Sequence, residues 1–438
     1  MDRRTLYGLT LLSIGLLLVV PLGVWMEQSV FSQPRWLGEV EDGLRTGQYL
    51  QAPGALSYDP KDGNLWVAPS VIIPVGPAKW GNVTAVNPVT GGLVATVVAM
   101  TQDNRSIDPP VQWSVTTNAD GSVVFDLAAY LCSEPTPGSV CSNLTWIDPM
   151  RHSVTLSHVV EYEANAVAYD SGNGDLYLTG SLTANSSVTV INGTSGALIR
   201  QLPGGGAGVV ASPYTHRTFV GESNGTVMMI NDQTNQLMGW KPMEAHPSAY
   251  STCTMVLDGP RDRVYVAGVG SGSGAGPPVL VALNASTGKE MEAVALAPSG
   301  VDWSTDASSL LLDPENGYLY VTYESLPSSG GTAGGDGIEV VDPVDGAIMG
   351  SFQFGARPSP LAYDSSNGKI YVSDWSEGTI WVVNPNAPAP SWVTVVTGLP
   401  NADWAFVGMA CGTLLIVAGG LKLRKTRWKT EAGTAGNR

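Results

Sequence analysis

Charged side chains, and basic ones above all, are scarce in this 438-residue chain. Charged residues make up 14% of the sequence, and the formal net charge is −16 at pH 7. Between Glu27 and Asp403 there are 14 Lys and Arg against 36 Asp and Glu, which gives this region a net charge of −22. The region has no basic patch to neutralise phosphate groups, so nucleic-acid binding is not expected.

Histidine and cysteine are equally scarce, with four of each. The histidines form no His-x-His or His-Glu-x-x-His pair, so neither a zinc site nor a haem site is expected. Cys132 and Cys141 enclose a short loop that contains two prolines and a glycine and can close on itself. This spacing predicts a disulfide, as in chains that fold in oxidising compartments, and the alternative is two free thiols in a loop.

Two uncharged apolar runs lie near the ends of the chain, at 5–26 and 404–421. Each is about long enough to cross a hydrocarbon core of roughly 30 Å as a helix. The stub 1–4 carries two arginines, and the tail 422–438 is basic. Because positive flanks stay in the cytoplasm, both termini are predicted to be cytoplasmic, and 27–403 is predicted to be extracellular, at the cell membrane. Cleavage of the first run as a signal peptide is the alternative, and it would leave the second anchor unchanged.

Seven Asn-x-Ser/Thr sequons lie in the region predicted to be outside the cell, which agrees with a glycosylated surface protein. The alternative is that Asn, Ser and Thr are simply frequent in a turn-rich chain. The glycosylation candidates are Asn82, Asn104, Asn143, Asn185, Asn192, Asn224 and Asn284.

Long amphipathic helical patterns are missing between the two ends, whereas glycine is abundant, with 52 residues. A hairpin signature recurs instead: an apolar strand, a turn such as Asn367-Gly368, and a second strand with an aromatic residue at its centre. Asn-Gly between alternating apolar residues is a strong hairpin signal because both residues accept positive φ. The seven aromatic residues, 42 to 59 positions apart, are Trp66, Phe125, Tyr177, Phe219, Tyr265, Tyr320 and Tyr371.

Each hairpin is followed by a loop and by a third and a fourth short strand. Seven such antiparallel units, with a period of roughly 40–50 residues, predict an all-β seven-bladed β-propeller with four-stranded blades over 54–398. Stacking the units in a ring covers the faces that one unit cannot bury alone, so the repeated aromatic residue is expected to fill the space between neighbouring sheets. Residues 27–53 show no clear period and are predicted to be an extracellular linker.

Two of the units show the repeat most clearly, YDSGNGDLYLTG with VTVINGTSG and YDSSNGKIYVSD with IWVVNPN. On these motifs the chain resembles the YVTN-type, surface-layer-like repeat propellers of archaeal type, over about residues 54–398. The match is weaker in the second and fourth units, and in the fourth Pro213-Tyr214-Thr215-His216 replaces the Asn-Gly turn. The resemblance implies a cell-surface propeller with a binding or structural role. It transfers no active site, because the motif residues are turn and packing positions.

In a four-stranded meander, the second-to-third loops and the connections between units share one face, and most of these segments are long here. Binding is expected where long loops sit on a rigid scaffold. Aromatic side chains there would form a platform, and carboxylates an acidic rim or a calcium site. Scattered carboxylates on an acidic surface are favoured over a calcium site, because no spacing singles out a set of ligands. The candidate binding residues are Trp80, Trp113, Glu161, Tyr162, Glu163, Glu222, Trp303, Asp306, Tyr323, Glu324, Asp374 and Trp375.

The sequence thus predicts a membrane-anchored extracellular propeller that binds or scaffolds without catalytic residues of its own. Its expected partner is a membrane-proximal protein or a surface glycan. That expectation assumes that the last unit ends on its own outer strand. Both ends of the propeller would then lie on the face that carries the long loops, and this face would point towards the membrane. The alternative is a calcium-dependent propeller hydrolase or lyase of the lactonase type.

Overall fold

The structure, a computed structural model, describes stretches of the chain that all lie within one compact unit, Leu37–Ala387. The described residues are 39–44, 53–69, 82–99, 111–132, 139–180, 187–222, 225–243, 250–270, 279–296, 305–325, 336–354, 358–374 and 379–387. The predicted stub, membrane segments and tail, at 1–4, 5–26, 404–421 and 422–438, lie outside them. Within the described stretches, no helix has the length and apolar character that crossing a membrane requires.

Seven four-stranded antiparallel sheets, the blades, make up this unit. Blades 1 to 3 consist of β2 (Pro53–Asp59), β3 (Asn64–Pro69), β4 (Asn82–Val86), β5 (Leu93–Val98); β6 (Val111–Thr117), β7 (Val124–Cys132), β8 (Ser139–Asp148), β9 (Ser153–Val160); and β10 (Ala164–Tyr169), β11 (Asp175–Gly180), β12 (Ser187–Asn192), β13 (Leu198–Pro203). Blades 4 and 5 consist of β14 (Gly206–Ser212), β15 (Arg217–Glu222), β16 (Thr226–Asn231), β17 (Gln236–Pro242); and β18 (Tyr250–Asp258), β19 (Arg263–Gly270), β20 (Val279–Asn284), β21 (Glu290–Ala295). Blades 6 and 7 consist of β22 (Thr305–Leu312), β23 (Leu319–Ser325), β24 (Asp336–Val341), β25 (Ile348–Phe354); and β26 (Pro358–Asp364), β27 (Lys369–Asp374), β28 (Thr379–Asn384), β1 (Glu39–Leu44). The prediction of an all-β seven-bladed propeller with four-stranded blades is confirmed.

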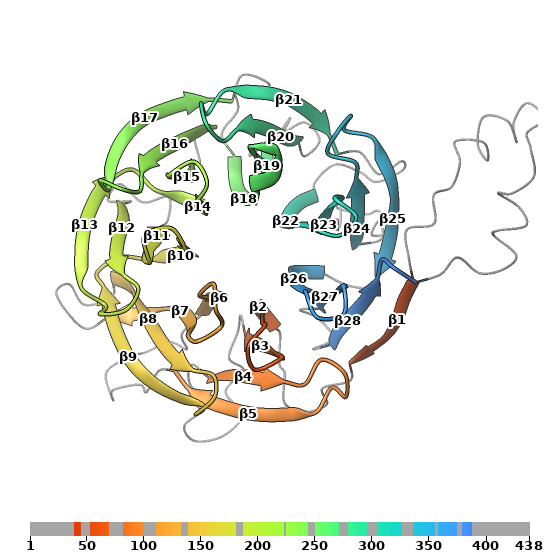
Figure 1. The fold of residues 1–438 in the computed structure, drawn as a ribbon, viewed down its shortest axis with the longest axis horizontal. Helices are drawn as coiled ribbons and strands as arrows, with labels where there is room; N and C mark the ends of the chain where they lie inside the picture. The colour runs from red at the N-terminus through yellow and green to blue at the C-terminus, as the bar shows by residue number, and fades with distance from the viewer. Residues whose placement is uncertain are drawn as a thin grey trace, which may run out of the picture. The chain divides into compact units, whose positions relative to one another are not determined.

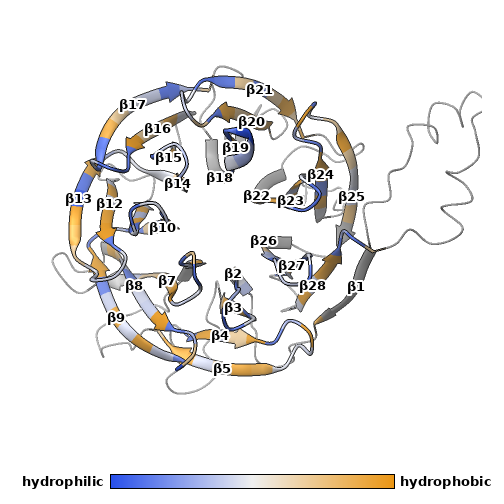
Figure 2. Ribbon diagram, viewed as in Figure 1, coloured by the Kyte–Doolittle hydropathy of each residue, from blue (hydrophilic) through white to orange (hydrophobic). Residues whose placement is uncertain are grey.

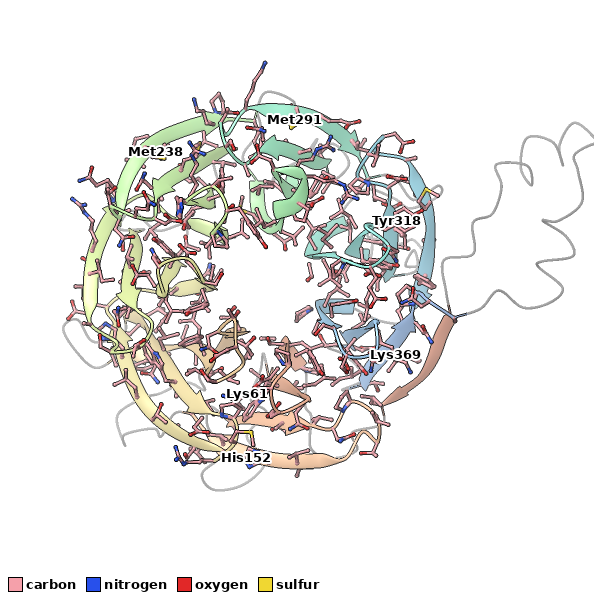
Figure 3. All side chains as sticks on the ribbon, in the orientation of Figure 1. Lys61, His152, Met238, Met291, Tyr318 and Lys369 are labelled. Atoms are coloured by element: carbon pink, nitrogen blue, oxygen red, sulfur yellow. The ribbon has the colours of Figure 1, made fainter. Side chains whose placement is uncertain are left out.

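The blades form a ring whose centre is surrounded by their first strands (Figure 1). Each first strand contacts the first strand of the next blade, and β26 of blade 7 contacts β2 of blade 1. The fourth strands run along the circumference, where Figure 2 shows both hydrophobic and hydrophilic positions. Met238 and Met291 on two of these outer strands (Figure 3) are 48% and 51% exposed. The core therefore lies between the blades, and the outer strands border solvent.

The aromatic residue at the centre of each second strand is buried between two blades, as predicted, and all seven are at most 1% exposed. Tyr265 packs in a cluster shared by blades 5 and 6, and Tyr371 packs in a cluster shared by blades 7 and 1. Their hydroxyl groups donate across the same interfaces to the carbonyl oxygens of Pro343 and Pro88, each at 3.4 Å. The interface that closes the ring is thus built like an internal one.

The N-terminal strand β1 supplies the fourth strand of blade 7, because it pairs antiparallel with β28. The prediction that 27–53 is only a linker is therefore wrong for Glu39–Leu44. The prediction of a fourth strand after β28, in the sequence SWVTVV, falls outside the described residues. The sequence of β1, EVEDGL, has fewer apolar residues than the outer strand of blade 1, LVATVV. Leu44 nevertheless packs against the core cluster between blades 7 and 1.

The propeller has two unlike faces, which the connections define. Turns between first and second and between third and fourth strands, such as 60–63 and 87–92, are short and lie on one face, the short-turn face. Lys61, His152 and Tyr318 in Figure 3 belong to these turns, and Lys369 begins β27 directly after one of them. Second strands end and third strands begin at the opposite face, as Pro69 and Asn82 do in blade 1; this face is called the long-loop face after the sequence connections that start and end there.

Both ends of the described propeller lie on the short-turn face. β28 runs from the long-loop face towards the short-turn face, and β1 begins opposite its end, so that Glu39 pairs with Asn384. The expectation that both ends leave from the long-loop face is therefore wrong. It placed the fourth strand of blade 7 after β28 in the sequence, whereas the ring takes that strand from the N-terminal side.

The turn that joins β14 and β15 departs from the repeat in the way that the sequence indicates. The corresponding turns in blades 3 and 7 end on Gly174 and Gly368, with φ of 78° and 70°. His216 takes this left-handed position in blade 4, with φ of 54°. A histidine tolerates this region better than a β-branched residue but less well than glycine, so the turn places an imidazole on the short-turn face at some conformational cost.

Candidate functional site: the long-loop face

The structure describes the side chains of half of the residues predicted to bind on the long-loop face. Trp80, Trp303 and Trp375 lie outside the described residues. The backbone of Trp113, Asp306 and Glu324 lies in β6, β22 and β23, and their side chains are outside the described set. The predicted aromatic platform is therefore untested and stays a prediction.

Glu222 and Asp374 occupy corresponding positions at the ends of second strands, and both carboxylates are buried. Oε1 of Glu222 accepts a hydrogen bond from the indole nitrogen of Trp240 at 2.9 Å, and Oε2 accepts one from the hydroxyl of Thr226 at 2.9 Å. Oδ2 of Asp374 accepts a bond from the indole nitrogen of Trp381 at 3.2 Å. These two carboxylates fix indoles within their own blades, which gives both a structural role.

Tyr162 and Tyr323 also have packing roles. The ring of Tyr162 lies over Gly180 and leaves no room there for a Cβ atom, and Tyr323 approaches Gly337 as closely. The Tyr162 hydroxyl donates to Oγ1 of Thr189 at 2.8 Å, and burial raises the pKa of this phenol. Tyr323 is 4% exposed, and Tyr162 is half-buried.

Among the predicted binding residues with described side chains, Glu161 is exposed and Glu163 is half-buried. They lie in the connection between β9 and β10 and flank the half-buried Tyr162. Tyr162 is locked by its bond to β12 in the same blade, so the two carboxylates project from a fixed base. This acidic pair is the part of the predicted rim that the structure presents to a partner.

The predicted sequons differ in accessibility. Asn104, Asn185 and Asn224 lie outside the described residues. Asn143 is 6% exposed, and its amide nitrogen donates to Oγ1 of Thr145 at 2.9 Å, so it cannot carry a glycan in the folded blade. The amide nitrogen of Asn284 donates to Oδ2 of Asp262 at 2.7 Å. Asn82 and Asn192 lie at strand ends and are half-buried.

Cys141 is disulfide-bonded. It lies on β8, which pairs with β7, the strand that ends at Cys132. Cys132 pairs with Ser139 in this ladder, two residues from Cys141. The side chain of Cys132 is outside the described set, so its identity as the partner of Cys141 stays a prediction.

The structure shows a set of buried carboxylates that the sequence reasoning passed over. Four aspartates at the end of a first strand or directly after it have an Oδ1 that accepts a hydrogen bond at 2.8 Å from a backbone N–H two residues later: Asp59, Asp170, Asp313 and Asp364. These are Asx turns, in which the side chain substitutes for a backbone acceptor. The available signal is the Asp that stands before this turn in five of the seven blades, although turn geometry alone explains its presence.

Glu339 on β24 is a second kind of buried carboxylate. It is 2% exposed, and its Oε1 has no hydrogen-bond donor among the described residues. Glu339 pairs with Val321 of β23. At the position of Glu339, blade 4 has Met228 and blade 5 has Val281, both of which are apolar. Burial raises the pKa of Glu339 to about 7. Within the described stretches, no group of three or more His, Cys, Asp or Glu side chains is placed to hold a metal ion.

The fold and its two faces define the chain as a seven-bladed β-propeller with turns on one face and long connections on the other. A β-propeller domain of Myceliophteria thermophila Cps50 (Swd1) is similar, with a TM-score of 0.55 and 9% identity over 76% of this chain and 96% of that one. A chain of a mitotic checkpoint complex is similar too, with a TM-score of 0.56 and 12% identity over 81% of this chain and 94% of that one. At these identities the likeness concerns the fold alone.

The sequence comparisons are negative. No family model matches the chain, and no curated protein matches it in sequence. The YVTN-type resemblance therefore rests on the repeat motifs themselves.

Proposed function

We propose that this chain is a membrane-anchored, extracellular β-propeller of YVTN type that binds or scaffolds an external protein or glycan through its long-loop face. The uncharged runs at 5–26 and 404–421, with their positive flanks, support the anchoring and the outside location of the propeller. The long connections, the exposed Glu161 and the half-buried Glu163 support binding at the long-loop face.

The pairing of β1 with β28 is the observation that carries the orientation. Because Glu39 lies opposite Asn384, the chain enters and leaves the propeller side by side on the short-turn face. Anchors on both sides of the propeller would hold that face towards the membrane. The long-loop face would then point away from the cell, so its partner approaches from outside and is not membrane-proximal.

Epitope tags on the two faces of one blade test this proposal. One tag is inserted between Ser329 and Gly330, in the connection from β23 to β24, and the other between Val344 and Asp345, in the turn from β24 to β25. Val344 is 65% exposed, so the second insertion displaces no core side chain. On intact cells we expect an antibody to reach the first tag fully, and to reach the second tag fully only after solubilisation of the membrane.

The outcomes separate the parts of the proposal. Equal labelling of both tags on intact cells contradicts the orientation and leaves the outside location standing. Labelling of neither tag until the membrane is permeabilised contradicts the outside location. Recovery of both tagged proteins in the supernatant of washed cells contradicts the anchoring.

A further inference from the structure

The turns that join the third and fourth strands of a blade share one position that lies against the preceding blade. Its backbone carbonyl accepts a hydrogen bond across the interface at five places: Pro88 from Tyr371, Gly193 from Trp146, Asp232 from Asn173, Ala285 from Arg217 and Pro343 from Arg263. Blades 2 and 7 have Pro149 and Pro385 at this position. Asp232 of blade 4 is thus the one residue of the seven that places an ionisable side chain there.

Asp232 meets another carboxyl group across the interface. Asp170, the turn aspartate of blade 3, is 0% exposed, Asp232 is 1% exposed, and their side chains lie within hydrogen-bonding reach of each other. Oδ1 of Asp170 accepts a bond from the backbone N–H of Gly172 at 2.8 Å. Oδ2 of Asp170 and both oxygens of Asp232 are buried without a well-placed donor among the described residues. Each of these oxygens is therefore open to a proton.

The groups around the pair compensate its charge only in part: the backbone N–H groups of Asp232 and Gln233 lower the pKa of Asp232, but by less than burial and Asp170 raise it. On the side of blade 3, Asp175, Tyr169 and Tyr177 surround Asp170, and Oδ2 of Asp175 accepts a bond from Asn235 at 3.1 Å. The guanidinium of Arg200 donates to the carbonyl oxygen of Asn235 at 3.1 Å. On the side of blade 4, Nδ1 of His216 lies 3.5 Å from Oδ1 of Asp232, and its side chain is 50% exposed. Of these two basic groups, only His216 contacts the pair, and it is charged only when protonated.

We propose that Asp170 and Asp232 bind one proton between them and so form a proton-dependent latch between blades 3 and 4. With the proton bound, the O–H of one carboxyl group donates to the carboxylate of the other, and the pair carries a single negative charge. When the proton leaves, two buried anions face each other and repel, which weakens this interface. The other six interfaces have no second carboxylate at the equivalent position and lack the latch.

The direction of the pKa shift of Asp232 agrees with this geometry. Burial, followed by the contact with Asp170, raises the pKa of Asp232 from 3.8 to about 7. A carboxyl group whose pKa is raised on folding gives stability that is fully present below the unfolded value and is lost as pH rises through the folded value. The shared proton should therefore stay bound at pH 5 to 6 and leave between pH 7 and 8, which weakens the interface between blades 3 and 4.

Isosteric amide variants of the full chain test the latch. Asp232→Asn and Asp170→Asn each remove the shared proton but keep the shape of the side chain. We expect each single variant to unfold about 5 °C higher than the parent at pH 8 and to match it near pH 5. The double variant should gain no more than either single one, because the two carboxyl groups titrate as a unit. If Asp232→Asn does not fold, Asp232→Ala, which reproduces Ala285 of blade 5, replaces it in the series.

Glu339→Gln is the matched control, since Glu339 is also buried, has a raised pKa and lies in blade 6. Its effect on the unfolding temperature at pH 8 should add to that of Asp232→Asn, whereas the effect of Asp170→Asn should not add to it. In the Glu339→Gln background, the infrared carbonyl band of protonated carboxyl groups should have a component that titrates near pH 7 and is lost in Asp232→Asn, whereas the component of Asp59, whose pKa burial raises to about 6, should remain. Additive effects of Asp170→Asn and Asp232→Asn overturn the proposal.

Two further measurements exclude other sensors. His216→Asn, which tolerates the left-handed turn, should keep the pH response of the parent. Loss of that response would identify a histidine–aspartate pair as the sensor and overturn the shared proton. Added calcium should leave the unfolding temperature of the parent at pH 8 unchanged. A rise that Asp232→Asn abolishes would show that the pair binds a cation instead.

Discussion

Replacing Glu39–Leu44 by a Gly-Ser stretch of equal length is expected to lower the unfolding temperature by about 10 °C or more. The change removes the four-pair ladder between β1 and β28 and the packing of Leu44 against the cluster that joins blades 7 and 1. About 1 kcal/mol for each lost hydrogen bond and roughly 2 kcal/mol for the leucine give a loss of several kcal/mol. Thermal unfolding of the full chain, followed by circular dichroism, measures it.

The same replacement at 391–396, the SWVTVV segment, is the control. The fourth place in blade 7 is already taken by β1, so this second replacement should change the unfolding temperature by less than about 2 °C. A larger loss from 391–396 than from Glu39–Leu44 would mean that blade 7 completes itself from its own C-terminal side.

Tyr371→Ala is expected to cost about 3–5 kcal/mol of unfolding free energy, the usual range for removing a fully buried aromatic ring. Tyr371 is 1% exposed at the interface of blades 7 and 1, and its hydroxyl donates to the carbonyl of Pro88 at 3.4 Å. The loss combines the transfer of the ring from the core with the cavity that it leaves behind. Denaturant titration of the full chain measures the difference.

Tyr265→Ala is the matched variant at an internal interface. Tyr265 is also 1% exposed, and its hydroxyl donates to the carbonyl of Pro343 at the same distance, 3.4 Å. If β1 closes the ring as tightly as the chain joins other blades, the two variants should lose the same free energy to within about 1 kcal/mol. A much smaller loss for Tyr371→Ala would show that the closing interface is loose.

The sequence predicts the repeat well because the repeat is a local pattern. An aromatic residue at the centre of every second strand and a turn just before that strand recur seven times, and each aromatic residue is buried as expected. These signals depend on neighbours within one hairpin, and hairpin geometry is decided at short range.

The position of β1 could not be predicted, because it depends on pairing between segments at opposite ends of the chain. Its sequence, EVEDGL, has no apolar alternation, and the segment SWVTVV has a stronger strand pattern. Ring closure, which brings β26 against β2, places the edge of β28 where the N-terminal segment can reach it. Local β-propensity does not contain that information.

The site residues were predicted less well, for a related reason. Loop position alone placed Glu222 and Asp374 in an acidic rim, whereas the indoles of Trp240 and Trp381 hold their carboxylates inside the blades. The sequence does not single out Asp232, because its importance depends on Asp170, which lies on the neighbouring blade. In both cases the decisive partner comes from another strand or blade, and the spacing within a single repeat does not show it.

Amide hydrogen exchange at residues 39–44 of the intact chain tests the central claim most directly, namely that the propeller closes through β1 and that both ends leave from the short-turn face. The ladder with β28 predicts that the amides of β1 that bond to β28 exchange as slowly as those of β13 that bond to β12 in blade 3. Exchange of Glu39–Leu44 at the rate of an unstructured linker would contradict the closure, and with it the orientation that the proposed function requires.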